Sequence, residues 1–315
     1  MTPLVVVLGP TAAGKSEIAV ELALKLSGEI VSADSVQVYK YLDIGTARIT
    51  PGQQKGVAHH LLGFLEPDEE FTAAQYQQLA RETIDGIAGR GRLPILAGGT
   101  GLYIQAVIDP YEFPSQEGLM QVRQRLHSRM EAGRGEELYA ELQQVDPEAA
   151  GRIHPHDQRR ITRALEVYQL TQRPISSYRT TGAAPEPRYN LAMIGLSRSR
   201  PELYRRIDLR VDQMFRDGLV DEVRGLLERG CQPGLKPLQT LGYRQVISYL
   251  AGEYDLDTAI SLVKQATRNY AKRQLTWFGR DSRIRWWQLA EDAHPGAVSE
   301  EIAQFICRSI PVNVE

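Results

Sequence analysis

Two glycines, a lysine and a serine stand at fixed intervals near the start of the chain. They lie in GPTAAGKS, which fits the pattern G-x-x-x-x-G-K-[ST]. The glycines of such a loop allow backbone N–H groups to approach an oxyanion, and the following helix adds positive partial charge. Lys15 supplies a full charge, and the Ser16 hydroxyl can ligate Mg²⁺ that is carried by phosphate groups. The predicted diphosphate- or nucleotide-binding residues are Gly9, Pro10, Thr11, Ala12, Ala13, Gly14, Lys15 and Ser16.

Asp34 directly follows a second apolar run, Glu29–Ala33. A carboxylate at the end of a strand that faces a phosphate site can accept a proton or hold Mg²⁺ through water. An aspartate in this position can equally cap the next turn of the backbone. Position alone leaves both interpretations open.

Arg206 and Arg210 are four residues apart in a predicted helix, so they share one face. Two guanidinium groups suit a diphosphate, because each presents a planar set of N–H donors. The alternative is a salt-bridged helix face, since Asp208 and Asp212 are close in sequence.

Basic residues also gather in two other regions. One contains Arg123, Arg125 and Arg129 together with QRRITR at 158–163, a pattern that suits a polyanion surface or a lid over ATP phosphates. In the other, residues 268–287, basic and aromatic side chains alternate, as in single-strand nucleic-acid surfaces. Such aromatic residues are more often core, and we expect Trp277 to be packed.

The elements that position these residues follow from short apolar runs. Runs at 4–8, 29–33, 93–97 and 191–196 are predicted to be parallel strands, because helix-like sequence separates them. Ligands of such sheets bind beyond the carboxyl ends of the strands. This rule brings Gly9–Ser16, Asp34–Gln37 and the glycine-rich turn Gly98–Gly101 around one crevice. The predicted fold class is α/β, a P-loop NTPase-like parallel sheet core with helices on both faces.

The middle of the chain lacks a convincing strand. Helical patterns fill it, and proline-rich segments bound it on both sides. We therefore predict a mostly helical insertion domain at 113–187, within a core made of 1–112 and 188–315.

Composition sets further limits. The 315 residues are 42% hydrophobic and 24% charged with a net charge of −2, so any nucleic-acid surface must be local. The two cysteines are far apart, which favours a reducing compartment. No apolar run is long enough for a bilayer, and the first strand leaves no room for a leader peptide. We expect a cytoplasmic monomer without membrane contact.

Seven segments in order resemble the tRNA dimethylallyltransferases, over nearly the whole chain. They are GPTAAGKS (9–16), ADSVQVYKYLDIGTA (33–47), HHLL (59–62), LAGGTGLY (96–103), VDPEAAGRIHPHDQRRITRALEVY (145–168), QTLGYRQ (239–245) and RNYAKRQLTWF (268–278). The chain departs from the family at Gly279, where an arginine usually follows the aromatic pair.

The resemblance implies that the glycine loop holds dimethylallyl diphosphate with Mg²⁺, rather than ATP. It further implies that Asp34 is the general base for an adenine amine immediately 3′ of the anticodon, and that Thr11, Lys15 and Arg210 assist transfer. Residues implied to contact the tRNA anticodon stem-loop are Asp34, Ser35, Val36, Gln37, Thr100, Arg123, Gln158, Arg159, Arg160, Ile161, Thr162, Gln239, Gly242 and Arg244.

Two other enzyme classes share these features in part. A P-loop small-molecule kinase would use the same loop, with Asp34 as the base for a hydroxyl group. An adenylate isopentenyltransferase would prenylate a free nucleotide. The long arginine-bearing insertion disfavours both.

Overall fold

The computed structural model describes residues 1–111, 113, 118–179 and 187–311 of the chain. It divides into two compact units. The core unit comprises Met1–Asp109 and Arg188–Glu315, and the insertion unit comprises Pro110–Pro187. The sequence predicted the boundaries of the insertion between residues 112 and 113 and between residues 187 and 188.

A parallel sheet organises the core unit, with six strands among the described residues. Its strand order is β3-β2-β4-β1-β5-β6, and every pairing is parallel. The strands are β1 (Thr2–Leu8), β2 (Gly28–Ala33), β3 (His59–His60), β4 (Leu93–Gly98), β5 (Tyr189–Arg198) and β6 (Arg285–Leu289). Gly98 pairs with both Leu8 and Ala33, so the segments that follow β1, β2 and β4 leave the sheet at the same edge.

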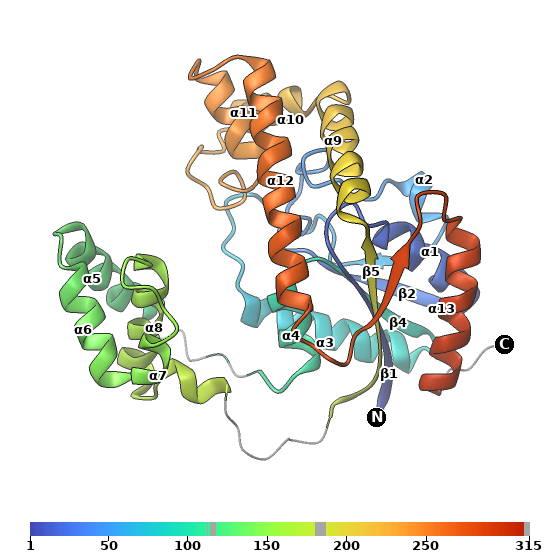
Figure 1. Ribbon diagram of the computed structural model, residues 1–315, viewed down its shortest axis with the longest axis horizontal. Coiled ribbons are helices and arrows are strands. Elements are labelled where there is room, and N and C mark those ends of the chain that lie inside the picture. The colour runs from blue at the N-terminus through green and yellow to red at the C-terminus, as the bar shows by residue number, and fades with distance from the viewer. Residues whose placement is uncertain (112, 114–117, 180–186, 312–315) are drawn as a thin grey trace. The chain divides into compact units, whose positions relative to one another are not determined.

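Helices cover both faces of this sheet (Figure 1). Alternate β1 side chains point to opposite faces: Val5 and Val7 pack with α1 (Lys15–Lys25) and α13 (Pro295–Ser309), and Leu4, Val6 and Leu8 pack with α3 (Ala73–Gly89) and α4 (Gly101–Ile108). A strand buried on both faces needs an unbroken apolar run, which explains the sequence of β1. The predicted α/β class with a covered parallel sheet is confirmed.

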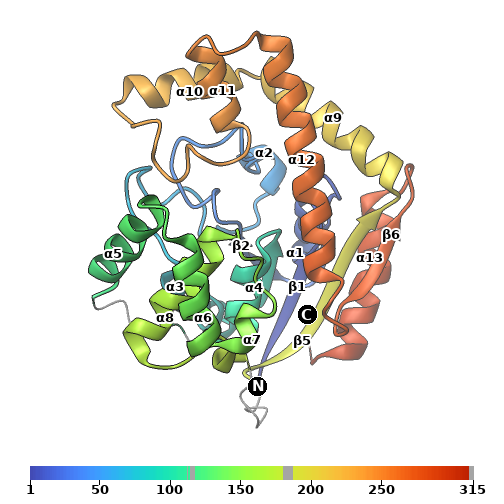
Figure 2. The same cartoon turned by 60° about the vertical axis from the view of Figure 1, so that its left-hand side comes forward.

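Beyond the carboxyl edge of the sheet lie α9 (Arg200–Arg216), α10 (Leu219–Glu228) and α11 (Tyr243–Leu250), and α12 (Leu256–Phe278) runs from them back to α4 (Figure 2). The short helix α2 (Pro51–Gln54) precedes β3. The long helices α9 and α12 run side by side (Figure 2) and bury Ile207 and Val263 in one apolar cluster. Ala12 of the glycine loop belongs to the same cluster, so this helix pair packs directly on the loop.

The described residues of the insertion unit form helices joined by turns, namely α5 (Leu119–Glu131), α6 (Gly135–Val145), α7 (Pro147–Ala150), α8 (Gln158–Thr171) and a 3₁₀ helix, η1 (Ile175–Arg179). Leu126, Leu138 and Leu165 belong to a core of its own. The Asp157 side chain accepts a hydrogen bond from the Arg160 N–H and caps α8.

Two strands of the sheet, β3 and β6, were not predicted from the sequence. β3 has only two residues, and β6 alternates exposed and buried positions within the segment that was read as a nucleic-acid surface or core. The Trp287 side chain of β6 is buried and donates to Glu301, so it is core. The expectation that Trp277 is packed was wrong, because 42% of this residue is exposed on α12. None of the helices in the described ranges has the length and apolarity to span a membrane.

Candidate active site

The glycine loop joins β1 to α1 at the carboxyl edge of the sheet. Gly9 has φ +144°, and a Cβ atom there would lie 2.3 Å from the Leu196 carbonyl oxygen. Gly14 has φ +104° and is the N-cap residue that precedes α1, without a side-chain cap. Only glycine fits the first position, and the second leaves the N–H groups of the first helical turn available to a ligand.

Cationic side chains hold three carbonyl groups of the loop. Lys15 Nζ donates to the Pro10 oxygen at 2.8 Å, Arg206 Nε to the Ala12 oxygen at 3.0 Å, and Arg198 Nε to the Ala13 oxygen at 3.3 Å. Three cationic side chains therefore lie against the loop and occupy its Pro10, Ala12 and Ala13 carbonyls. This environment favours an anion at its amides.

The two acids closest in sequence to Arg206 and Arg210 pair with other residues. Asp208 pairs with Arg268 and Asp212 pairs with Lys264, both on α12. The salt-bridged alternative for the α9 face therefore fails for Arg206, which bonds the loop instead.

Electrostatics link Lys15 to residues on two other elements. Burial, reinforced by the positive charge of Arg210 and opposed by Asp34, lowers the pKa of Lys15 to about 7. Burial and the nearby Arg206 also lower the pKa of Arg210. Lys15, Arg210 and Asp34 therefore lie close enough to interact electrostatically, and their roles toward a diphosphate and as a base stay predictions.

Asp34 both caps a turn and offers an oxygen for chemistry. Its Oδ1 accepts hydrogen bonds from the N–H groups of Val36 at 2.9 Å and Gln37 at 3.2 Å. Among the described residues no donor bonds its Oδ2. The two interpretations that the sequence left open are therefore compatible, because each oxygen can serve one of them.

Thr100 lies beside the Asp34 turn. Its Oγ1 accepts the Ser35 N–H at 3.1 Å, so the turn after β2 is bonded to the turn after β4. Tyr270 of α12 lies next to Thr100 and Asp34. Burial together with the charge of Asp34 raises the pKa of Tyr270 to about 12. From the sequence, Tyr270 was expected only as one of the aromatic residues of the basic segment 268–287.

Gln274 of α12 is a residue that the sequence analysis missed. Its Oε1 accepts the Thr11 N–H at 2.8 Å, and its Nε2 donates to the Gly99 oxygen at 2.9 Å. Only 6% of Gln274 is exposed, and a Cβ atom at Gly99 would lie 2.3 Å from its Nε2. One amide thus joins the glycine loop to the Gly98–Gly101 turn. The only sequence signal was its place in the segment RNYAKRQLTWF.

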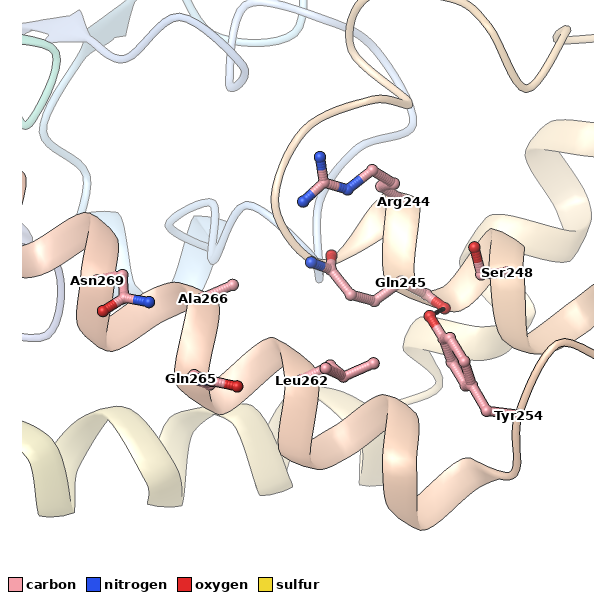
Figure 3. Close-up of a pocket in the computed structure, with 8 residues that line it drawn as sticks. All are labelled: Arg244, Gln245, Ser248, Tyr254, Leu262, Gln265, Ala266 and Asn269. Carbon is pink, nitrogen blue, oxygen red and sulfur yellow. Dashed lines mark hydrogen bonds between the residues drawn. The ribbon is translucent and has the colours of Figure 1, made fainter.

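Three residues expected at an RNA surface lie at the start of α11 or just before it. Gln239 and Arg244 are exposed, whereas Gly242 is buried and donates its N–H to Gln245 Oε1. Arg244 lines an open cavity of about 340 Å³ between α11 and α12 (Figure 3). The other lining residues are Gln245, Ser248, Tyr254, Leu262, Gln265, Ala266 and Asn269.

The remaining RNA candidates belong to the insertion unit. Arg123 pairs with the buried Glu166, and Arg160 lies 3.4 Å from Asp157. Gln158 and Arg159 are exposed, and Thr162 is half-buried. The expectation for Ile161 is wrong as a side-chain contact, because this residue is fully buried in the core of the unit.

The chain is similar to known proteins over nearly its whole length. The model of the family described as IPP transferase matches residues 37–281. A protein of Moorella thermoacetica named tRNA dimethylallyltransferase is 49% identical, covering 99% of this chain and 98% of the relative. The crystal structure of a tRNA isopentenylpyrophosphate transferase from Bacillus halodurans has a TM-score of 0.73 at 40% identity, covering 98% of this chain and 97% of that one. A eukaryotic dimethylallyltransferase, described as acting on tRNA, has a TM-score of 0.83 at 25% identity, covering 100% and 82%.

Proposed function

The chain belongs to the IPP transferase family, and we propose that it transfers a dimethylallyl group from dimethylallyl diphosphate to tRNA. The acceptor is the N6 amine of the adenine immediately 3′ of the anticodon, and diphosphate is released. One observation carries this proposal. The glycine loop and Asp34 leave the sheet at the same edge, where the Asp34 carboxylate is close enough to affect the pKa of Lys15.

On the donor side, the leaving diphosphate develops negative charge as the carbon–oxygen bond breaks. The loop amides, Lys15 and Arg210 are placed to stabilise that charge. The Thr11 N–H donates to Gln274 and is therefore occupied, so Thr11 would contact the diphosphate through its side-chain hydroxyl.

On the acceptor side, an adenine amine is a poor nucleophile, because its lone pair is delocalised into the ring. Asp34 Oδ2 can accept the amine proton as the new carbon–nitrogen bond forms. The adenine must leave the base stack of the anticodon loop to reach the prenyl carbon, at a cost of a few kcal/mol.

Mg²⁺ suits this site as an ion carried by the diphosphate. Within the described ranges, His, Cys, Asp and Glu form no group that could hold a metal alone. Ser16 is an exposed residue in the first turn of α1, where its hydroxyl would complete the coordination of an ion that phosphate oxygens already bind. When bound, the ion adds positive charge to the leaving group.

The RNA contacts of the proposal come from two surfaces. In the core unit they are Ser35, Val36, Gln37, Thr100, Gln239, Gly242 and Arg244. In the insertion unit they are Arg123, Gln158, Arg159, Arg160 and Thr162, which we assign to the backbone and shape of the anticodon stem-loop.

The test supplies labelled dimethylallyl diphosphate with either an unmodified anticodon stem-loop or AMP. We expect label on the RNA alone. Label on AMP alone would favour an adenylate isopentenyltransferase, and ATP turnover without RNA would favour a kinase. Either result would overturn the proposal.

A further inference from the structure

The carboxylate of Glu222, a residue of α10, accepts hydrogen bonds from four donors. Glu222 itself lies outside the seven family-like segments of the sequence. Its Oε2 accepts the N–H groups of Asp43 at 2.9 Å and Ile44 at 2.7 Å. Its Oε1 accepts the Gly45 N–H at 3.0 Å and the Tyr243 hydroxyl at 2.7 Å. Three successive amides that converge on an anion form a backbone nest, and here the protein's own carboxylate fills it.

The turn that Glu222 holds is also closed from its other side. A Cβ atom at Gly45 would lie 2.6 Å from the ring of Tyr243, the first residue of α11. Tyr243 is fully buried, and burial together with Glu222 raises the pKa of its hydroxyl well above the ordinary value. The turn Asp43–Gly45 is therefore fixed between α10 and α11.

This turn is bonded directly to the segment proposed to receive the RNA base. Gln37 Nε2 donates to the Thr46 oxygen at 3.0 Å, and Arg48 donates to the Gln37 oxygen at 3.1 Å while pairing with Asp43. Gln37 in turn donates its N–H to Asp34 Oδ1. Hydrogen bonds thus run from Glu222 through the turn to the Asp34–Gln37 segment.

Resting on the function proposed above, we propose that Glu222 is a positioning residue for the acceptor RNA. It holds Asp34 and Gln37 in place through the Asp43–Gly45 turn, and it does not contact either substrate. The donor loop is held by other side chains, namely Lys15, Arg198, Arg206 and Gln274. Loss of Glu222 should therefore affect the RNA substrate and spare the diphosphate.

The decisive variant is Glu222→Gln, which keeps the shape of the side chain. An amide can accept at one oxygen only, and its NH₂ group would face backbone donors. We expect the KM for the stem-loop to rise about tenfold or more, with the KM for dimethylallyl diphosphate unchanged within about twofold. Hydrogen exchange should show weaker protection of residues 43–45.

Two further variants complete the experiment. Tyr243→Phe removes a single donor and should give a smaller rise in the RNA KM, in the same direction. Asp221→Ala is the control, because Asp221 is exposed on the same helix and pairs only with Arg224 among the described residues.

The outcomes separate this inference from the function on which it rests. If wild type prenylates the stem-loop but Glu222→Gln leaves the RNA KM unchanged, or raises both KM values equally, the positioning role is wrong and the function stands. Should Glu222→Gln fail to fold, an unchanged RNA KM in Tyr243→Phe overturns the role. Wild type that labels only AMP contradicts both.

Discussion

Charge is concentrated on very few side chains around the glycine loop. The Lys15 amine is held among Arg210, Asp34 and the Pro10 carbonyl, with Arg206 and Arg198 bonded to the neighbouring carbonyls. Burial and Arg210 together make the protonated amine costly when no anion is present. A diphosphate would reverse this balance, because it supplies the negative charge that favours the ammonium form.

Binding of diphosphate should therefore take up a proton. The free protein has a Lys15 pKa of about 7, against an ordinary value of 10.5. Between these pH values the free amine is mostly neutral and the bound amine is protonated, so affinity should fall as pH rises above 7, by up to about tenfold per unit. Calorimetry of Mg²⁺–diphosphate binding at pH 8.5, in buffers of different ionisation enthalpy, measures the uptake.

The control for proton uptake is Lys15→Met, which should bind diphosphate more weakly without the pH-dependent component that belongs to the lysine. Equal proton uptake by the variant and the wild type would show that the titrating group lies elsewhere, for example on the diphosphate itself.

At the scale of elements, α12 connects the two loops that the proposed reaction needs. It contributes Gln274 to Thr11 and Gly99, and it supplies Arg268 and Lys264 to the acids of α9. Because Arg268 and Lys264 pair with Asp208 and Asp212, Arg206 is left to bond the glycine loop. The helix therefore shapes the donor site from a distance of more than 250 residues in sequence.

Replacement of Gln274 by methionine should weaken donor binding. Methionine fills similar space, but the Thr11 N–H and the Gly99 oxygen lose their partner. Loss of these two hydrogen bonds should raise the Kd for Mg²⁺–diphosphate about tenfold. Gln265→Met, at an exposed position of the same helix, should leave it unchanged. An unaltered Kd in Gln274→Met would mean that α12 does not set the loop geometry.

The sequence predicts local features of this site well and long-range ones poorly. The loop 9–16 and Asp34 were identified because motif, strand and helix lie within a few residues of one another. Gln274 and Glu222 were not, since their partners lie 263 and about 178 positions away. β6 was missed because Arg285 and Gln288 interrupt its apolar positions, which become visible only when it pairs with β5.

At the scale of the whole molecule, the chain carries a net charge of only −2 while its proposed substrate is a polyanion. Affinity for RNA must then come from local basic surfaces. Many arginines of the insertion unit are paired with carboxylates, as Arg123 is with Glu166 and Arg129 with Glu141. The sequence analysis did not anticipate these pairs, because the acids are scattered along other helices.

Arg160 lends itself to a test of this surface, because its side chain is 70% exposed. The Arg160→Ala variant should bind the stem-loop more weakly. The slope of log Kd against log salt should fall by about the amount that one phosphate contact contributes. Arg308→Ala, an exposed residue of α13, should leave the slope unchanged. Binding measured at several salt concentrations decides the matter, and equal slopes for Arg160→Ala and wild type would remove Arg160 from the interface.

The central claim is that one edge of the sheet holds a prenyl diphosphate while Asp34 deprotonates an RNA base. Asp34→Asn tests it most directly, because asparagine keeps an oxygen for the Val36 and Gln37 amides and loses only the basic oxygen. The measurement is the single-turnover rate of transfer to the stem-loop with both substrates saturating. We predict a fall of about 10²- to 10⁴-fold, with both binding constants close to wild type. A variant that transfers the prenyl group at the wild-type rate would contradict the account.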